Sequence, residues 1–238
     1  MFKHINHTIE RPFVKTAHDE TGHYYITPDG KKYPSITTIF KLLDDMSWYE
    51  HWVNSIMKKL DMTKKEAEVE CKRIGNESME VGTELHKMAE GYLNNSYPVT
   101  FGRYEVDINM LFESLKEHLD EHVNNIHGTE SELYSDELEL AGTVDCIAEY
   151  DGVLSVIDFK NSRKPKTNSE CKKKNYYTQI TAYAKMWEFC TGQKIDQGVI
   201  LVISWDGKVK PFIVKIDDHE EELWNKLIEI EQYKALNS

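Results

Sequence analysis

One stretch of the sequence decides the fold: Leu140-Ala-Gly-Thr-Val-Asp145-Cys-Ile-Ala-Glu-Tyr-Asp151-Gly152-Val-Leu-Ser-Val-Ile-Asp158-Phe-Lys160. Two runs rich in β-branched residues flank Asp151-Gly152, and an Asp-Gly connection between such runs predicts a β-hairpin of fixed register. That register sets Asp145 opposite Asp158, Thr143 opposite Lys160 and Ile147 opposite Val156, with all six side chains on one face. The sequence therefore predicts two neighbouring carboxylates with an ammonium group one pleat beyond.

The paired carboxylates predict a metal ion. Like charges directly opposite each other destabilise a strand pair, because their Cβ atoms lie only ~4.5–5.5 Å apart. A hard divalent cation bound by carboxylate oxygens is the usual compensation. The alternative is that Asp145 and Asp158 face solvent, as most aspartates do. Apolar neighbours on both faces of the hairpin argue against this alternative, since unpaired carboxylates are costly when buried.

The composition limits the classes of protein to which the chain can belong. The chain has 238 residues, of which 40% are hydrophobic, enough for one sizeable core with a helical elaboration. No apolar run reaches the ~18 residues of a membrane span. The N-terminus lacks the features of a signal or transit peptide, and four scattered cysteines favour reduced thiols. We expect an intracellular, cytoplasmic protein of a bacterial or phage-infected cell, without membrane contact.

The charge pattern bears on partners. A formal net charge of −12 argues against passive coating of nucleic acid, which depends on phosphate neutralisation by Lys and Arg. It leaves room for a local basic track, and Lys160, Arg163, Lys164, Lys166 and residues 172–174 follow the hairpin. Such a run is typical of a solvated loop. Beside a metal site it also predicts a surface that contacts a phosphate backbone.

The order of elements predicts an α/β (α+β) fold: a mixed central β-sheet flanked by helices, with an N-terminal helical elaboration. A hairpin is expected within residues 1–34. Helices are expected over 36–43, over 47–95 with a break near Gly75-Asn76, and over 103–125. Strands at 131–140, 142–150 and 153–160, a helix at 175–191, strands at 197–205 and 208–216 and a helix at 218–235 complete the series. We divide the chain into an N-terminal portion, 1–130, and a core, 131–238, which form one compact unit.

Three smaller groups of residues are candidates for the site. Ser35 and Thr37 begin a helix, where a hydroxyl caps free N–H groups or the N–H groups receive a phosphate. His86 lies at the edge of the buried face of a helix, as a boundary residue or a metal ligand. Glu90 follows His86 by one turn, and Gly82, one turn before it, permits close approach of a backbone or substrate strand. Gln179 and Tyr183 share a helix face and can bind water or phosphate, although core packing of the tyrosine is the default.

Taken in order, these motifs resemble a known family. Gly82-x-x-x-His86-x-x-x-Glu90, Gly142-Thr-Val-Asp145, Asp158-Phe-Lys160 and Gln179-x-x-x-Tyr183 together resemble the RecB-type branch of the PD-(D/E)XK nucleases. Within that branch, Tyr33-Pro-Ser-Ile-Thr-Thr and the stretch from Gly142 to Lys166 look most like the group of the mitochondrial genome maintenance exonuclease and its phage and bacterial relatives. Each motif alone is weak, whereas the ordered set, over residues 33–190, is specific.

The resemblance implies a restriction-endonuclease-like core and a role for each motif. His86, Asp145, Asp158 and the Phe159 carbonyl would hold Mg²⁺ or Mn²⁺, and Lys160 would orient or deprotonate the attacking water. Its ammonium form should be disfavoured by the cation and by burial. Gln179 and Tyr183 would support the site and the scissile phosphate. DNA contacts are expected at Ser35, Thr37, Ser162, Arg163, Lys164 and Lys166, with Gly82, Glu90 and Gly142 in support.

Two departures from the family pattern have consequences. Asp158 occupies a position where the family often has Glu, although RecB-type members commonly have Asp there. Some relatives bind an iron–sulfur cluster through cysteines, but Cys71, Cys171 and Cys190 do not have that spacing, so we expect no cluster.

The function expected from the sequence is a metal-dependent DNA exonuclease that acts on single-stranded ends or flaps in replication, recombination or repair, under an arch of N-terminal helices. Alternatives are a structure-selective endonuclease, a hydrolase of another phosphodiester and a catalytically silent DNA-end-binding subunit. Trp48, Tyr49, Trp52 and Tyr92 are either core residues or platforms for stacked bases. The sequence does not identify which proteins, if any, bind this chain.

Overall fold

The computed structural model describes residues 1–6, 15–19, 22–43, 47–96 and 104–237. Its centre is a sheet of five strands in the order β4 (Val123–Ser135), β5 (Leu140–Tyr150), β6 (Val153–Ser162), β7 (Gln197–Ser204) and β8 (Val209–Lys215). β6 and β7 are parallel, and the other neighbours are antiparallel. The predicted mixed sheet is confirmed.

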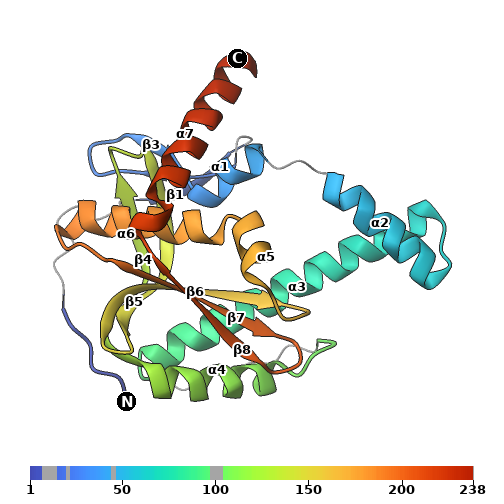
Figure 1. Ribbon diagram of the computed structural model, residues 1–238, viewed down its shortest axis with the longest axis horizontal. Coiled ribbons are helices and arrows are strands. Elements are labelled where there is room, and N and C mark those ends of the chain that lie inside the picture. The colour runs from blue at the N-terminus through green and yellow to red at the C-terminus, as the bar shows by residue number, and fades with distance from the viewer. Residues whose placement is uncertain (7–14, 20–21, 44–46, 97–103, 238) are drawn as a thin grey trace.

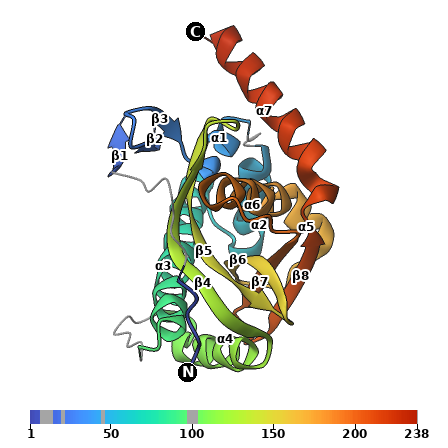
Figure 2. The same ribbon diagram turned by 90° about the vertical axis from the view of Figure 1, so that its left-hand side faces the viewer.

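Helices cover both faces of this sheet (Figures 1 and 2). On one face, α6 (Tyr176–Thr191) packs on alternate strand residues such as Ile147, Val156 and Ile200, and α7 (Asp217–Asn237) packs against α6 and β8. On the other face, α3 (Lys64–Leu93) and α4 (Ile108–His122) pack on Ile157, Phe159, Leu201 and their neighbours. The period-2 alternation of strands therefore divides the core into two layers, as the flanking-helix prediction requires.

The β5–β6 hairpin turns at the predicted dipeptide. Asp151 and Gly152 have φ of 51° and 78°, so both lie in the left-handed region that a two-residue turn of the primed type demands. The register from this turn pairs Tyr150 with Val153 and Ile147 with Val156. The hairpin and its register near the turn are confirmed.

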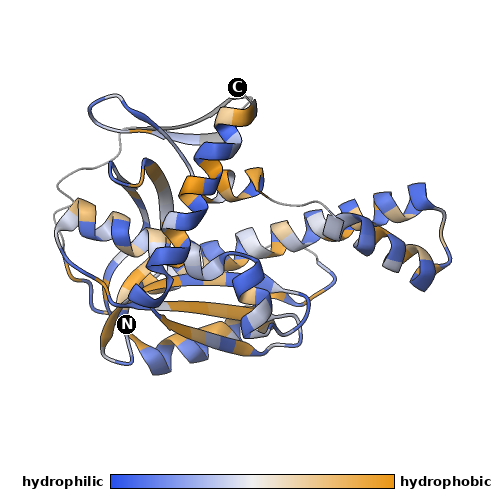
Figure 3. Ribbon diagram, turned by 45° about the horizontal axis from the view of Figure 1, so that its top comes forward, coloured by the Kyte–Doolittle hydropathy of each residue, from blue (hydrophilic) through white to orange (hydrophobic). Residues whose placement is uncertain are grey.

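A helical projection extends away from the sheet (Figure 3). It consists of α2 (Ser47–Leu60) and the first half of α3, packed through Trp52, Val53, Ala67 and Cys71. The predicted break at Gly75-Asn76 is wrong, because α3 is continuous there. The break lies at 61–63, where Asp61 has φ of 52° and Thr63 starts α3 with a capping box.

The N-terminal hairpin prediction is confirmed, with β1 (Lys15–Asp19), β2 (Gly22–Ile26) and β3 (Lys32–Pro34) in one antiparallel sheet. α1 (Ile36–Leu42) follows, and the bridge between Ser35 and Ala141 attaches this unit to β5. The basic loop contains a short helix, α5 (Asn168–Lys173), with its own capping box.

β4 begins well before the predicted strand start at residue 131. The helix expected over 103–125 is α4, which ends at His122, and its expected start at 103 lies outside the described residues. β4 contains irregularities between Asn124 and Gly128, which hide its alternation in the sequence. β4 also crosses the boundary expected at residues 130 and 131, so the division into two portions stays a prediction. None of the helices in the described ranges combines the length and the apolar character needed to cross a bilayer.

Candidate active site

The sheet opens into a fork between β5 and β6. The ladder between them runs from the turn as far as Cys146 and Ile157. Beyond that point the amide N–H of Phe159 donates to Asp145 Oδ2 at 2.7 Å. β5 meanwhile stays paired with β4, and β6 with β7. The expected ladder pairings of Asp145 with Asp158 and of Thr143 with Lys160 are not formed, because the Asp145 side chain occupies the place of a main-chain acceptor.

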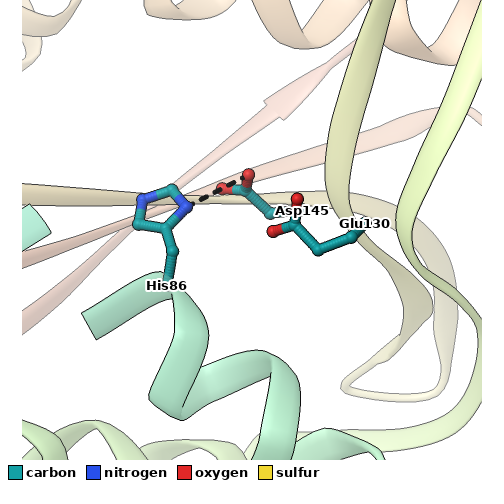
Figure 4. Close-up of side chains that lie close together, drawn as sticks. All are labelled: His86, Glu130 and Asp145. Carbon is teal, nitrogen blue, oxygen red and sulfur yellow. Dashed lines mark ion pairs between the residues drawn. The ribbon is translucent and has the colours of Figure 1, made fainter. Parts of the chain in front are cut away.

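Asp145 stands at the base of this fork beside a histidine and a second carboxylate (Figure 4). His86 Nδ1, from α3, lies 3.3 Å from Asp145 Oδ1. Glu130, from β4, completes a group in which one ligand atom of each residue lies within 4.8 Å of the others. The structure thus brings His86 to Asp145 as expected, and it adds Glu130.

The sequence does not reveal Glu130 as a site residue, because the irregular first half of β4 hides the strand to which it belongs. β4 pairs Thr129 with Cys146 and Ser131 with Val144, so Glu130 is the neighbour of Asp145 across the two strands. Its φ of 43° is left-handed, which is uncommon outside glycine. A strand begun at residue 131 leaves Glu130 in a connection. One sequence signal could have identified Glu130: it is an acidic residue on the strand that pairs with β5, at the position across from Asp145.

Asp158 and Lys160 lie on the β6 arm of the fork. Asp158 is only 3% exposed, and Lys160 Nζ forms an ion pair with its Oδ2 atom. Apart from this charge contact, Asp158 Oδ2 is buried without a hydrogen-bond partner among the described residues. Lys160 Nζ also lies 5.2 Å from the centre of the Tyr176 ring.

The electrostatics of the cluster indicate a deficit of positive charge. Burial, followed by the charge of Asp145, raises the pKa of Glu130 to about 7. Burial likewise raises the pKa of Asp158 to about 6, with Lys160 opposing the rise and Asp145 adding to it. Both carboxyl groups therefore hold protons more tightly than free acids, which is the expected result of crowding negative charge in a buried site.

His86 and Asp145 stabilise each other's charges. Burial lowers the pKa of His86, but the charge and hydrogen bond of Asp145 outweigh it and bring the value to about 9. Burial raises the pKa of Asp145, yet His86, Lys160 and the Phe159 N–H lower it overall. The protonated imidazole thus supplies positive charge at this position.

Lys160 differs from the sequence-based expectation. Burial lowers its pKa, but the charges of Asp158 and Asp145 outweigh burial and hold the pKa above its ordinary value. The ammonium form is therefore favoured by the surrounding acids. A cation that neutralised those acids would remove this stabilisation.

The residues fit a divalent metal ion. Carboxylate oxygens are ordinary ligands for Mg²⁺ or Mn²⁺, and imidazole nitrogens bind divalent transition metals. The Glu130 carboxylate has no hydrogen bond or ion pair in the described part of the chain, and Asp158 Oδ2 has only its contact with Lys160. Asp158 Oδ2 is buried and Glu130 is half-buried, and acceptors withdrawn from water are costly unless a cation or a proton satisfies them.

Helix α6 covers the sheet face opposite to α3, and it contacts the β5 arm of the fork. Gln179 Nε2 donates to the Tyr183 hydroxyl at 3.1 Å, and both side chains are buried, so their predicted shared face is confirmed. Burial raises the pKa of Tyr183 well above its usual range. Gly142 has a clear role, because a Cβ atom there would lie 2.7 Å from Tyr183 Cε1.

The residues predicted to contact DNA have different environments in the structure. Ser35 is buried and caps α1 by accepting from Thr38 N, whereas Thr37 is exposed. Ser162 donates to the Lys164 carbonyl, and Lys166 pairs with Glu170 at 3.5 Å. Arg163 is held by carboxylates of its own chain, and Lys164 is exposed. Their contacts with DNA stay predictions.

The other supporting residues lie on α3. Glu90 is half-buried, one turn beyond His86, and Gly82 faces Asn161 at an ordinary contact distance. Of the candidate stacking residues, Trp48 and Trp52 have nearly parallel rings 6.3 Å apart on α2, and Trp48 is 47% exposed. Tyr92 donates to Asp120 on α4.

A mixed sheet whose forked strands carry carboxylates and a lysine is the arrangement of a nuclease core. The sequence model of the PD-(D/E)XK nuclease superfamily matches residues 82–232, more than half of the chain, and the chain belongs to this superfamily.

Curated relatives include nucleases of two kinds. The chain is 30% identical to human mitochondrial genome maintenance exonuclease 1 over 161 residues, which are 64% of this chain and 44% of that protein. It is 32% identical over 79 residues to one chain of the ATP-dependent helicase/nuclease from Acetivibrio thermocellus, covering 33% of this chain and 6% of that one. The chain thus spans less than half the length of these relatives.

Solved structures show a weaker similarity. A proposed exonuclease from Eubacterium rectale has 10% identity and a TM-score of 0.43, covering 66% of this chain and 69% of that one. A phage-related exonuclease from Haemophilus somnus has 13% identity and a TM-score of 0.33, covering 64% and 78%.

We predict opposite effects for two glycines of the motifs. Gly142→Ala should destabilise the protein by about 1–3 kcal/mol, because the new methyl group overlaps the Tyr183 ring. Gly82→Ala should raise stability by about 0.5–1 kcal/mol, because a Cβ atom fits there and alanine favours the helix. Urea unfolding measures both. Equal stability of the Gly142→Ala variant and the unmodified protein would contradict the assigned packing.

We also predict that metal affinity rises with pH. Protons on Asp158, Glu130 and His86, with pKa values of about 6, 7 and 9, compete with the cation, so affinity for Mn²⁺ should increase from pH 6 to pH 8. Glu130→Gln should weaken binding, while Glu137→Gln in the β4–β5 turn serves as the matched control. Titration calorimetry in buffers of different ionisation enthalpy counts the protons released. A pH-independent affinity would refute the competition.

Proposed function

We propose that this protein is a divalent-metal-dependent exodeoxyribonuclease, acting at single-stranded DNA ends or flaps in replication, recombination or repair. The observation that carries the proposal is the fork, where His86, Glu130 and Asp145 form one group and Asp158 pairs with Lys160 on the β6 arm. Membership of the superfamily supports DNA hydrolysis. The exonuclease named among the relatives supports action at ends.

Each residue of the site has a proposed role. His86, Asp145, Asp158 and the Phe159 carbonyl hold Mg²⁺ or Mn²⁺, and Glu130 joins them from β4. When bound, the cation lowers the pKa of a water molecule and stabilises charge on the phosphoryl oxygens. Lys160 orients that water from the β6 arm. Gln179 and the protonated Tyr183 hydroxyl fix the position of β5 beneath the scissile phosphate.

The DNA track is proposed along the segment after β6. Lys164 is exposed at its start and Lys173 on α5. Ammonium groups of this kind neutralise phosphates without reading bases, which suits an enzyme that degrades any sequence. Trp48, exposed on the helical projection, is a candidate platform for a base. The cytoplasmic location expected from the sequence stays a prediction.

We predict that Lys160→Ala lowers kcat about 100- to 10,000-fold, the range for loss of one positioned acid or base group. End-labelled single- and double-stranded DNA, in linear and circular form, is incubated with Mg²⁺, Mn²⁺ or EDTA. Cleavage should require metal and a free end, and DNA binding should survive the substitution. Lys215→Ala, exposed at the end of β8, is the control.

Three outcomes would count against the proposal. Cleavage of circular DNA would favour the structure-selective endonuclease. Binding of DNA ends without cleavage in either metal would favour the catalytically silent DNA-end-binding protein. Full activity of Lys160→Ala would remove the assigned role of that residue.

A further inference from the structure

The residues that follow Lys160 on β6 attach this strand to α3. Asn161 Nδ2 donates to the Ser78 carbonyl at 2.7 Å, and Asn161 Oδ1 accepts from Trp205 Nε1 at 2.6 Å. One amide thus joins α3, β6 and the β7–β8 turn. Both polar atoms of the Asn161 side chain are engaged, so its orientation is fixed.

Arg163 makes the second attachment. Its Nη2 atom lies 2.6 Å from Glu77 Oε2, and its Nη1 atom lies 3.0 Å from Glu105 Oε2. Nε donates to Ser78 Oγ at 3.2 Å, and the guanidinium lies 3.9 Å from the centre of the Trp205 ring. Every nitrogen of the guanidinium therefore contacts α3 or the segment after residue 103, a geometry that lysine cannot reproduce.

The attachment continues along one face of α3. Ser78, Gly82 and His86 are spaced by four residues, so they lie in a row on the helix. Ser78 contacts Asn161, and Gly82 faces the Asn161 side chain, where a Cβ atom would lie at 3.7 Å. At the end of the row, the His86 and Phe159 rings form a T-shaped pair, with 6.0 Å between centroids. This row of α3 residues therefore connects the contacts of Asn161 with the candidate metal site.

The position of His86 relative to Asp145 depends on how α3 is aligned along β6. Its Nδ1 atom is 3.3 Å from Asp145 Oδ1. A slip of one residue would move α3 by about 1.5 Å along its axis and turn it by about 100°, which breaks that contact. Displacement of this size is enough to disable a metal or catalytic site.

We propose that Asn161 and Arg163, together with their acceptors Glu77 and Ser78, form a clamp that positions His86 against Asp145 by fixing α3 on β6. Arg163 is then a positioning residue and not the phosphate contact expected from the sequence. This inference rests on the proposed metal site.

The test compares Arg163→Lys and Glu77→Gln with Glu80→Gln, a matched change at an exposed position of α3 outside the clamp. Isothermal calorimetry measures Mn²⁺ binding without DNA. Anisotropy of a labelled single strand in EDTA measures DNA binding, and hydrogen exchange measures the opening of residues 78–86. Asn161→Ala is the second variant if Arg163→Lys does not fold.

We expect both clamp variants to weaken Mn²⁺ binding about 10- to 100-fold, as loss of outer partners of metal ligands does, and to lower kcat. Exchange in residues 78–86 should accelerate, and DNA affinity should change less than about two-fold, well within the effect of one lost phosphate contact. Glu80→Gln should leave Mn²⁺ affinity unchanged.

The alternatives give different results. If Arg163 contacts phosphate, Arg163→Lys weakens DNA binding and Glu77→Gln does not. Mn²⁺ affinity is then unchanged in both variants. This combination of results overturns the clamp. Faster exchange with unchanged Mn²⁺ affinity also overturns positioning. If the unmodified protein neither binds Mn²⁺ nor cleaves DNA, the proposed function fails. Faster exchange in Arg163→Lys would then still support the clamp on α3, and unchanged exchange would overturn it.

Discussion

The site depends on one hydrogen bond, in which a carboxylate takes the place of a main-chain acceptor. Phe159 N–H donates to Asp145 Oδ2 where the β5–β6 ladder stops. Because each strand remains paired with its other neighbour, the sheet keeps its continuity while a fork opens within it. A buried amide must have a partner. Asp145 provides this partner with one oxygen and keeps the other for His86.

Around this bond the fold concentrates negative charge where solvent is scarce. Three adjacent strands bring Glu130, Asp145 and Asp158, and the two outer acids have raised pKa values as a result. His86 and Lys160 only partly balance these charges. A site of this kind is unfavourable for stability by itself, since buried charges require full compensation. Its persistence in a well-packed core is understandable if a divalent cation supplies the remaining charge.

Much of the fold could be predicted from the sequence, because local chemistry determines it. Asp151-Gly152 specifies the turn, and the turn specifies the register as far as Cys146 and Ile157, one residue short of the two aspartates. The fork could not be predicted, because it arises from competition between a side chain and the backbone for one amide. Glu130 was missed because β4 is irregular before it. Arg163 was interpreted as a phosphate contact because the sequence does not show that Glu77 and Glu105 lie beside it.

The most direct measurement of the central claim is the position of a bound cation. Crystals of the protein with Mn²⁺ give anomalous difference density that locates the ion without reference to activity. The account predicts Mn²⁺ at the fork, with an Asp145 oxygen in its coordination sphere and Glu130 or Asp158 as a further ligand. Density confined to other acidic surfaces, with the fork closed by protons and the Lys160 ion pair, would contradict it.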